Sequence, residues 1–220
     1  MTASITRPAA VLFDCDGVVV DSEPATFDLL AEDFAARGLT LDRPRMEALF
    51  LGGTIERCGR IAAELGADIP ADWVPTFYEQ LYARLATGTP MIPGIVAVFD
   101  ALDAAGIPYA IGSNGSLRKM RITLGQHPAL AGRLEGRIFS GQDLGMLKPA
   151  PDLYLHAAAS LGADPAQCVV IEDSPTGARA AYAAGMRCHG YAPHGGAETL
   201  AAEGAVPFTT MDDLPALLGL

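Results

Sequence analysis

An apolar run near the start of the chain ends abruptly at two carboxylates, and this junction constrains the fold more than any other stretch. Residues 9–13 are Ala-Ala-Val-Leu-Phe. They are followed by Asp14, Cys15, Asp16 and Gly17, so that one cysteine separates the two acids. The short apolar run predicts a buried strand, and a two-residue period near its end places Asp14 and Asp16 on one side. In open α/β sheets, ligands lie at the carboxyl ends of strands, where these acids fall. For this motif alone, an Asp-rich turn that caps a strand is the alternative.

From residue 94 onwards the chain alternates between helical and strand-like segments, which predicts βαβ units and a parallel sheet. The strand-like segments are 107–111, 137–140, 168–171 and 186–190, and the helical segments are 94–105, 116–125, 152–161 and 175–184. Right-handed crossovers would place helices on both faces of the sheet. The predicted fold class is therefore α/β, with a doubly wound, Rossmann-like parallel sheet.

A helical stretch interrupts this pattern directly after the first strand. Residues 21–88 have little strand character, and Phe27 and Phe34 belong to one apolar helical stripe. We therefore expect an all-helical cap domain at 21–88, inserted into an α/β core domain that consists of 1–20 and 89–220.

The composition restricts the class of partner. Half of the 220 residues are apolar and the formal net charge is -11, which argues against disorder and against a nucleic-acid or anionic-membrane partner. No long apolar stretch follows the first residues, so neither a signal peptide nor a membrane span is expected. The four cysteines form no Cys-x-x-Cys pair and are expected to be buried free thiols, as suits a reducing cytoplasm. A monomer is the default expectation.

Polar residues of a particular kind follow each of the first four core strands. They are Asp14 and Asp16, Ser113 and Asn114, Lys148, and Glu172 and Asp173. In a parallel sheet these strand ends lie at one edge, so the residues are expected to converge. Carboxylates with one ammonium and one hydroxyl suit a divalent metal ion together with a phosphate, because Mg²⁺ prefers oxygen ligands.

At these positions the sequence resembles the haloacid dehalogenase superfamily. The four motifs of that family match Asp14–Val18, Ser113–Asn114, Lys148–Pro149 and Glu172–Ser174. The resemblance covers the whole chain, and the helical insertion is similar to the family's C1-type cap. Four motifs in the right order, each at a predicted strand end, are far more specific than one.

The resemblance implies a catalytic role for both acids of the first motif. Asp14 would be the nucleophile that forms an aspartyl-phosphate, and Asp16 would protonate the leaving oxygen and then deprotonate the attacking water. Mg²⁺ would be held by Asp14, by the backbone carbonyl of Asp16 and by Asp173. Glu172 would be a further or a water-mediated ligand.

The resemblance also implies a phosphate-binding set. Ser113, the backbone amide of Asn114 and Lys148 would hold the phosphoryl oxygens together with Asp14. Lys119 and Lys148 are the only lysines among the 15 Lys and Arg residues of the chain. Where arginine is so strongly preferred, a lysine beside prolines indicates a requirement for a compact point charge. A surface lysine beside a turn is the alternative for Lys148.

Within the superfamily the sequence most resembles the β-phosphoglucomutase-like branch, and its motifs are typical of the phosphatase members. Mutases of that branch usually carry a Lys-Gly pair and then an arginine in a cap specificity loop. The matching loop here consists of Leu51, Gly52, Gly53 and Thr54, followed by Ile55. Without the lysine and the arginine of the mutase loop, binding of a second phosphate would be weaker. Arg57 and Arg60, one helical turn further on, could replace these two cations.

We therefore expect a Mg²⁺-dependent phosphatase that acts on a small phosphorylated metabolite, namely a sugar, sugar-acid or polyol phosphate. A phosphosugar mutase stays open as a second enzyme hypothesis, and a dehalogenase is a third, whose chemistry needs neither Asp16 nor Mg²⁺. The non-enzyme alternative is a phosphoacceptor signalling domain. Such domains also use a strand-end aspartate and a lysine, but they lack a helical insertion after the first strand.

Overall fold

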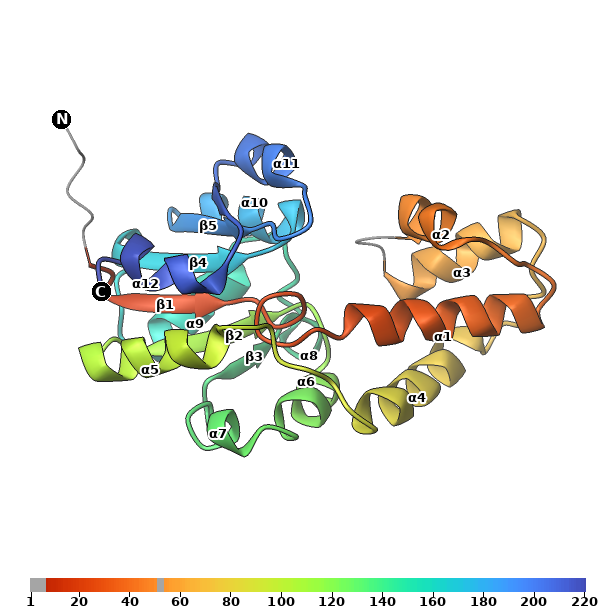
Figure 1. The fold of residues 1–220 in the computed structure, drawn as a ribbon, viewed down its shortest axis with the longest axis horizontal. Coiled ribbons are helices and arrows are strands. Elements are labelled where there is room, and N and C mark those ends of the chain that lie inside the picture. Colours follow the sequence, from red (N-terminus) through yellow and green to blue (C-terminus); the bar gives the residue numbers. More distant parts are fainter. Residues whose placement is uncertain (1–6, 51–53) are drawn as a thin grey trace. The chain divides into compact units, whose positions relative to one another are not determined.

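The computed structural model describes residues 7–50 and 54–220, and these divide into two compact units. The first unit comprises the residues up to Asp21 together with Pro90–Leu220, and the second comprises Ser22–Thr89. The first is an α/β unit and the second contains helices α1 to α4 (Figure 1).

The α/β unit is built on a parallel sheet with the strand order β3-β2-β1-β4-β5-β6 (Figure 1). Its strands are β1 (Ala10–Phe13), β2 (Tyr109–Ser113), β3 (Ile138–Ser140), β4 (Cys168–Glu172), β5 (Arg187–Tyr191) and β6 (Val206–Phe208). Phe13 at the end of β1 is in register with Ile111 on β2 and with Ile171 on β4. The order reverses between β1 and β4, which is where sheets of this kind bind ligands. The predicted doubly wound α/β fold is confirmed.

Helices follow the strands along the rest of this unit. They are α5 (Ile95–Ala105), α6 (Leu117–Leu124), α7 (Pro128–Ala131), α8 (Gly141–Leu144), α9 (Asp152–Ser160), α10 (Pro175–Ala183), α11 (Ala197–Ala202) and α12 (Leu214–Leu217). Two short 3₁₀ segments, Pro165–Gln167 and Met211–Asp213, complete the described elements. Within residues 7–50 and 54–220, no helix has both the length and the apolar character needed to cross a bilayer.

The central strand β1 is apolar throughout because both of its faces are covered. Val11 and Phe13 belong to a core cluster with side chains of α5, α6 and α12, whereas Ala10 and Leu12 pack with side chains of α9, α10 and α11. On the first face, the ring of Phe13 lies 4.9 Å from that of Phe99 between centroids. Burial on both faces explains why this strand reads as a continuous apolar run rather than as an alternating one.

The chain leaves and re-enters the α/β unit at two adjacent segments. Val20 and Met91 form an antiparallel bridge. The amide of Asp21 donates to the carbonyl of Pro90 at 2.8 Å, and the amide of Ile92 donates to the carbonyl of Val19 at 3.0 Å. These bonds hold the two ends of the inserted helical unit next to each other.

The helical unit is organised around an aromatic cluster, defined here as Phe34, Phe50, Trp73 and Phe77. Its helices are α1 (Glu23–Ala36), α2 (Arg43–Phe50), α3 (Ile55–Glu64) and α4 (Trp73–Ala86). The indole of Trp73 is 1% exposed, and its ring centroid lies 5.7 Å from Phe34 and 5.0 Å from Phe77. Its Nε1 donates a 2.6 Å hydrogen bond to the carboxylate of Asp33. The cluster is therefore a packed core with a single polar tie.

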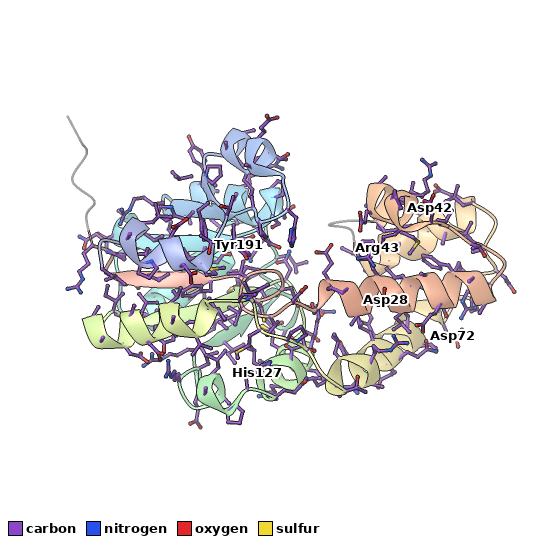
Figure 2. The ribbon with its side chains drawn as sticks, in the orientation of Figure 1. Asp28, Asp42, Arg43, Asp72, His127 and Tyr191 are labelled. Atoms are coloured by element: carbon purple, nitrogen blue, oxygen red, sulfur yellow. The ribbon has the colours of Figure 1, made fainter. Side chains whose placement is uncertain are left out.

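Charged side chains connect the helices of this unit at its surface. Arg43 of α2 donates to Asp28 of α1 at 3.3 Å and to Glu47 at 2.6 Å (Figure 2). The guanidinium of Arg43 also lies 4.9 Å from the centroid of the Phe27 ring. Exposed pairs of this kind contribute little to stability.

Candidate active site

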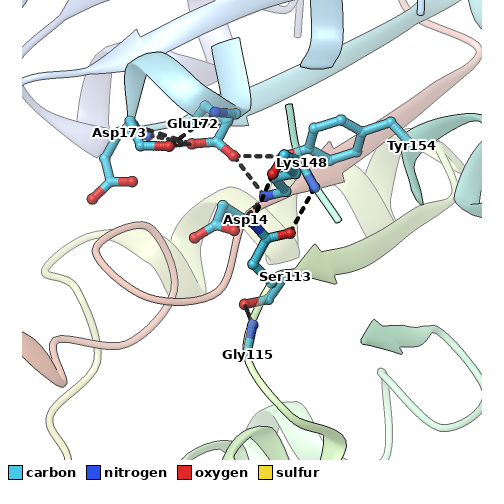
Figure 3. Close-up of polar contacts among 10 residues, drawn as sticks. Asp14, Ser113, Gly115, Lys148, Tyr154, Glu172 and Asp173 are labelled. Carbon is cyan, nitrogen blue, oxygen red and sulfur yellow. Dashed lines mark hydrogen bonds and ion pairs between the residues drawn. The ribbon is translucent and has the colours of Figure 1, made fainter. Parts of the chain in front are cut away.

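The polar residues that follow the strands meet at one edge of the sheet. Asp14 follows β1, Ser113 ends β2 and Glu172 ends β4, while Lys148 reaches them from the loop after α8 (Figure 3). Because β1 is hydrogen-bonded to both β2 and β4, the ends of these three strands are neighbours. The convergence expected from the sequence is therefore present. We call Asp14, Lys148, Tyr154, Glu172 and Asp173 the strand-end cluster.

Lys148 lies at the centre of the strand-end cluster. Its Nζ contacts Asp14 Oδ1 at 2.5 Å and Glu172 Oε1 at 2.6 Å, and its side chain is 3% exposed. The ammonium also lies 4.7 Å from the centroid of the Tyr154 ring, within cation–π range. Burial alone would lower the pKa of Lys148, but the charges of Asp14 and Glu172 outweigh burial and raise it. The two carboxylates therefore stabilise the charged form of Lys148, whose ammonium contacts Asp14.

The backbone of Lys148 is held by the side chain of Asn114. The Lys148 amide donates to Asn114 Oδ1 at 2.8 Å, and Asn114 Nδ2 donates to the Lys148 carbonyl at 3.1 Å. A cis peptide bond joins Lys148 to Pro149. Asn114 is expected from the sequence to contribute its backbone amide, and this side-chain clamp on Lys148 was not predicted.

Glu172 is fully buried, and hydrogen bonds engage both oxygens of its carboxylate. Oε1 accepts from Lys148 and, at 2.8 Å, from the hydroxyl of Tyr154. Oε2 accepts from the amides of Asp173 and Ser174 and from the Ser174 hydroxyl, at 2.9–3.1 Å. Burial would raise the pKa of Glu172, but Lys148 and these hydrogen bonds lower it. The arrangement favours Glu172 as an ionised support for Lys148 over direct metal ligation.

Three carboxylates approach closely enough to share a cation. One oxygen each of Asp14, Glu172 and Asp173 lies within 4.8 Å of the others. Gly17 makes this approach possible, because a Cβ at that position would lie 1.9 Å from Asp173 Oδ2. Gly17 also has a φ of 81°, a conformation that side-chain-bearing residues rarely adopt. The first motif thus needs its glycine for the backbone shape and for the space.

The crowding of these acids shows in their protonation. Burial is the largest cause that raises the pKa of Asp14, to about 7, with Glu172 and Asp16 adding to it and Lys148 opposing it. Burial, then Glu172 and Asp14, raise the pKa of Asp173 well above its usual range. Carboxylates that disfavour one another's charge in this way are the donor set that a divalent cation stabilises. The oxygen ligands of Asp14 and Asp173 therefore fit Mg²⁺.

The second acid of the first motif has its own basic partner. Asp16 Oδ1 lies 2.9 Å from Lys119 Nζ, and the two side chains are 29% and 17% exposed. Nearby, Ser113 Oγ accepts a 3.0 Å hydrogen bond from the amide of Gly115. Because that oxygen accepts from the backbone, the hydroxyl proton of Ser113 points elsewhere and can be donated to an anion.

The thiol between the two acids takes no part in this arrangement. Cys15 is fully buried, and burial raises the pKa of its thiol well above its usual range. All four cysteines are free and buried, as expected from the sequence. Cys15, Cys168 and Cys188 pack in the two apolar clusters on the faces of the sheet, and Cys58 is buried on α3 of the helical unit.

The cap specificity loop is represented only by Thr54. Leu51, Gly52 and Gly53 lie outside the described residues. The hydroxyl of Thr54 accepts a 3.2 Å hydrogen bond from the amide of Arg57 and caps the start of α3. Arg60, one of the two cations that could replace the missing pair, instead bonds Glu64 at 2.9 Å.

Two contributors to this site were not predicted. Tyr154 lies on α9, where a buried tyrosine reads as one more apolar helical position, so the sequence carries no signal for its bond to Glu172. Lys119 did carry a signal, because it is one of only two lysines. Unlike Lys148, it lies in none of the four motifs, so its scarcity had no motif beside it to indicate a role.

Comparison with known proteins extends the resemblance over most of the chain. The family model for haloacid dehalogenase-like hydrolases matches residues 8–185. Hexitol phosphatase A of Escherichia coli strain K12 is 34% identical over 197 residues, which cover 88% of this chain and 86% of that protein. The 6-phosphogluconate phosphatase of the same strain is 29% identical over 215 residues, which cover 97% and 96%.

A solved structure supports membership of the same family. A HAD family hydrolase from Deinococcus radiodurans R1, crystallised with bound phosphate and sodium, superposes with a TM-score of 0.82 and 34% identity. The alignment covers 97% of this chain and 96% of that one. The family expected from the four motifs is therefore confirmed. The chain belongs to the haloacid dehalogenase-like hydrolase family of enzymes.

Proposed function

We propose that the protein is a Mg²⁺-dependent phosphatase that hydrolyses a sugar, sugar-acid or polyol phosphate through an aspartyl-phosphate intermediate. The observation that carries this proposal is the buried Lys148 ammonium, held by Glu172 and directed at Asp14 at the end of β1. A carboxylate in contact with a fixed positive charge is suited to attack a phosphate, because the charge offsets the repulsion between two anions.

The reaction divides into two displacements at phosphorus. In the first, an oxygen of Asp14 bonds to phosphorus while the ester bond breaks, and Asp16 gives its proton to the leaving oxygen. In the second, Asp16 takes a proton from water, the water oxygen bonds to phosphorus, and the bond to Asp14 breaks. Free phosphate leaves and both acids return to their starting state. Lys148 stays charged through both steps.

Asp14 and Asp173 would hold Mg²⁺ through their carboxylates, and Asp16 would hold it through its backbone carbonyl. When bound, the ion screens the repulsion between Asp14 and the phosphate and stabilises charge on the transferred group. Glu172 would support the site without binding the ion directly, because its oxygens accept hydrogen bonds from Lys148 and from the turn after β4.

Ser113 and Asn114 would complete the phosphate site. The hydroxyl of Ser113 is 3% exposed and can donate its proton to a phosphoryl oxygen. The side chain of Asn114 is occupied by the backbone of Lys148, which leaves the Asn114 amide for the phosphate. In this way one residue would bind substrate and fix the lysine loop.

The substrate class rests on the relatives and on the cap loop. Two relatives are named for a hexitol phosphate and for 6-phosphogluconate, a polyol and a sugar-acid ester. The loop from Leu51 to Thr54 carries no cation, which favours hydrolysis over a mutase reaction that must bind a second phosphate. We propose this loop as the place where substrates are distinguished.

Phosphate release from a panel of phosphorylated sugars, sugar acids and polyols, with Mg²⁺ or with EDTA, tests the proposal. We expect selective, Mg²⁺-dependent release, and a loss of at least about 10⁴-fold in Asp14→Asn. Asp28→Asn, a surface carboxylate that is 61% exposed, is the matched control. Full hydrolysis by Asp14→Asn would defeat the proposal. Isomerisation of a hexose phosphate in the presence of its bisphosphate would instead identify a mutase.

A further inference from the structure

We infer that Lys119 is a positioning residue that fixes the carboxylate of Asp16 for proton transfer, an inference that rests on the function proposed above. The Nζ of Lys119 lies 2.9 Å from Asp16 Oδ1, at the same strand-end edge as Asp14. None of the four motifs includes Lys119. It is a basic residue that contacts the second acid of the first motif, not the first.

The local structure explains how Lys119 reaches Asp16. Helix α6 begins just after β2, and Ser116 caps it by accepting from the Lys119 amide at 3.2 Å. Side chains in a helix lean toward its N-terminus, so the Lys119 side chain runs back toward the strand ends. Gly115 lies beside both partners, because a Cβ there would be in ordinary contact with Lys119 Cδ at 3.7 Å and with Asp16 Oδ2 at 3.6 Å.

The distribution of lysines supports a specific role. The chain has 15 Lys and Arg residues, and its only two lysines contact the two acids of one Asp-x-Asp motif. Lys148 pairs with Asp14, and Lys119 pairs with Asp16. Arginines pair with surface carboxylates elsewhere, as in the contact of Arg179 with Glu203. A compact ammonium can hold one carboxylate oxygen without covering the other, which a planar guanidinium does less readily.

This geometry gives Lys119 a task that Lys148 cannot perform. The proposed acid–base group must face the leaving oxygen in the first step and the attacking water in the second. The ammonium of Lys119 can donate to Oδ1 both when Oδ2 carries the proton of the first step and when Asp16 is ionised. This contact restricts rotation of the carboxyl group and leaves Oδ2, on the side of Gly115, as the oxygen that gives and takes the proton. Restricting a catalytic group to its reactive orientation lowers the barrier without any contact to substrate.

The test uses two substrates that differ in their need for an acid. A hexitol phosphate has a poor leaving oxygen that must be protonated, whereas p-nitrophenyl phosphate releases an oxygen that leaves without a proton. The value of kcat/KM is compared for the two esters in Lys119→Met, Lys119→Arg and Arg121→Met, the last being an exposed cation of the same helix. This parameter reports the first displacement, in which Asp16 is the acid.

We expect Lys119→Met to lower kcat/KM about 10- to 100-fold for the hexitol phosphate and less than about threefold for p-nitrophenyl phosphate. Lys119→Arg should recover part of the loss, and Arg121→Met should have no effect. In an Asp16→Asn background, Lys119→Met should add nothing further, because both changes remove one function.

Equal losses on both esters would overturn the inference and would make Lys119 a phosphate-binding or folding residue. Unchanged kcat/KM in Lys119→Met would overturn it as well, as would additive losses in the double variant. A thermal melt of each variant identifies a loss that comes from misfolding. If the unmodified enzyme released phosphate from neither ester, the phosphatase proposal itself would fall, and this inference with it.

Discussion

The strand-end cluster and the aromatic cluster both lie largely out of solvent, but the first consists mainly of charged side chains and the second of aromatic ones. The first encloses an ammonium and three carboxylates, with Lys148 only 6% exposed. The second packs the rings of Phe34, Trp73 and Phe77 together and contains one polar tie, from Trp73 to Asp33. The α/β unit thus carries a charged cluster at the edge of its sheet, whereas the helical unit has an aromatic cluster as its core.

The difference separates what stabilises the protein from what performs its chemistry. Burying aromatic area is favourable by about 25 cal/mol per Å², so the aromatic cluster contributes to folding directly. Burying carboxylates beside one another is unfavourable, as shown by the rise in the pKa of Asp14 to about 7. The strand-end cluster is tolerated because the two-sided apolar core around β1 supports it.

Among changes outside the reacting groups, the largest expected effect comes from Gly17, which tests whether the strand-end cluster depends on close packing. Gly17→Ala places a Cβ 1.9 Å from Asp173 Oδ2 in a backbone with φ of 81°. We expect Mg²⁺-dependent kcat/KM to fall at least about 100-fold, because a displacement of about 1 Å at a catalytic group has that effect. The stabilisation of the protein by added Mg²⁺, measured as a shift in Tm, should shrink as well.

Gly185→Ala is the matched control, because Gly185 has a φ of 71° and a Cβ there would meet nothing within 4 Å. It should lose stability through backbone strain but keep its response to Mg²⁺. If both variants lost the same activity, backbone strain rather than the approach of Asp173 would be the cause.

The second effect belongs to the aromatic cluster. Trp73→Ala removes a side chain that is 1% exposed, and we expect the free energy of unfolding to fall by about 3–5 kcal/mol. Trp73→Phe keeps an aromatic ring and loses the bond to Asp33, so its loss should be smaller, near 1–3 kcal/mol. Urea unfolding measures both variants. Equal losses would mean that the polar tie, not the packing, supports this cluster.

A third, smaller effect tests how the strand-end cluster holds Lys148. Tyr154→Phe keeps the ring 4.7 Å from Lys148 Nζ and removes the hydroxyl that donates to Glu172 at 2.8 Å. We expect a loss of about 1.5–3 kcal/mol in the free energy of unfolding, typical of a hydrogen bond to a charged group. The value of kcat should fall while KM changes little. Tyr182→Phe, at a side chain that is 73% exposed, is the control.

The smallest effect concerns a buried polar group outside both clusters. His189 on β5 is 9% exposed, and among the described residues its Nδ1 has no hydrogen-bond partner. Burial, and then the charge of Arg187, lower its pKa below 6.5. The unfolded chain therefore binds a proton at His189 more readily than the folded protein does. The contribution of neutral His189 to the free energy of unfolding is intact above pH 6.5 and is lost as the pH falls below that value.

Urea unfolding at a series of pH values measures this contribution. His189→Leu should lose less stability than the unmodified protein when the pH falls from about 7 to about 5. His194→Leu, at an exposed position, should follow the unmodified protein. An unchanged acid response in His189→Leu would assign the acid sensitivity to other groups.

The sequence predicts those parts of the fold and the site that depend on runs of neighbouring residues. The apolar run of β1, the acids after it and the polar ends of β2 and β4 are contiguous patterns, and the parallel sheet made their convergence predictable. Helices α7 and α8 were not predicted, because four residues are too few to show a helical period.

The support behind the reacting groups could not be predicted. The clamp from Asn114 to Lys148 spans 34 positions of the chain, and the hydrogen bond from Tyr154 to Glu172 spans 18. Such contacts depend on the packing of complete elements, and no pattern of neighbouring residues records them. Motifs therefore revealed which residues face the substrate, whereas only the folded chain revealed what holds them.

The paired segments at which the helical unit joins the α/β unit have a consequence for how such enzymes diversify. Since Val20 bridges Met91 and Asp21 bonds Pro90, the insert begins and ends at one point of the host. An insert with adjacent ends can be lengthened, shortened or exchanged without moving the host strands. If the proposed loop in this insert distinguishes substrates, selection can change substrate preference within the insert while the α/β unit keeps its arrangement.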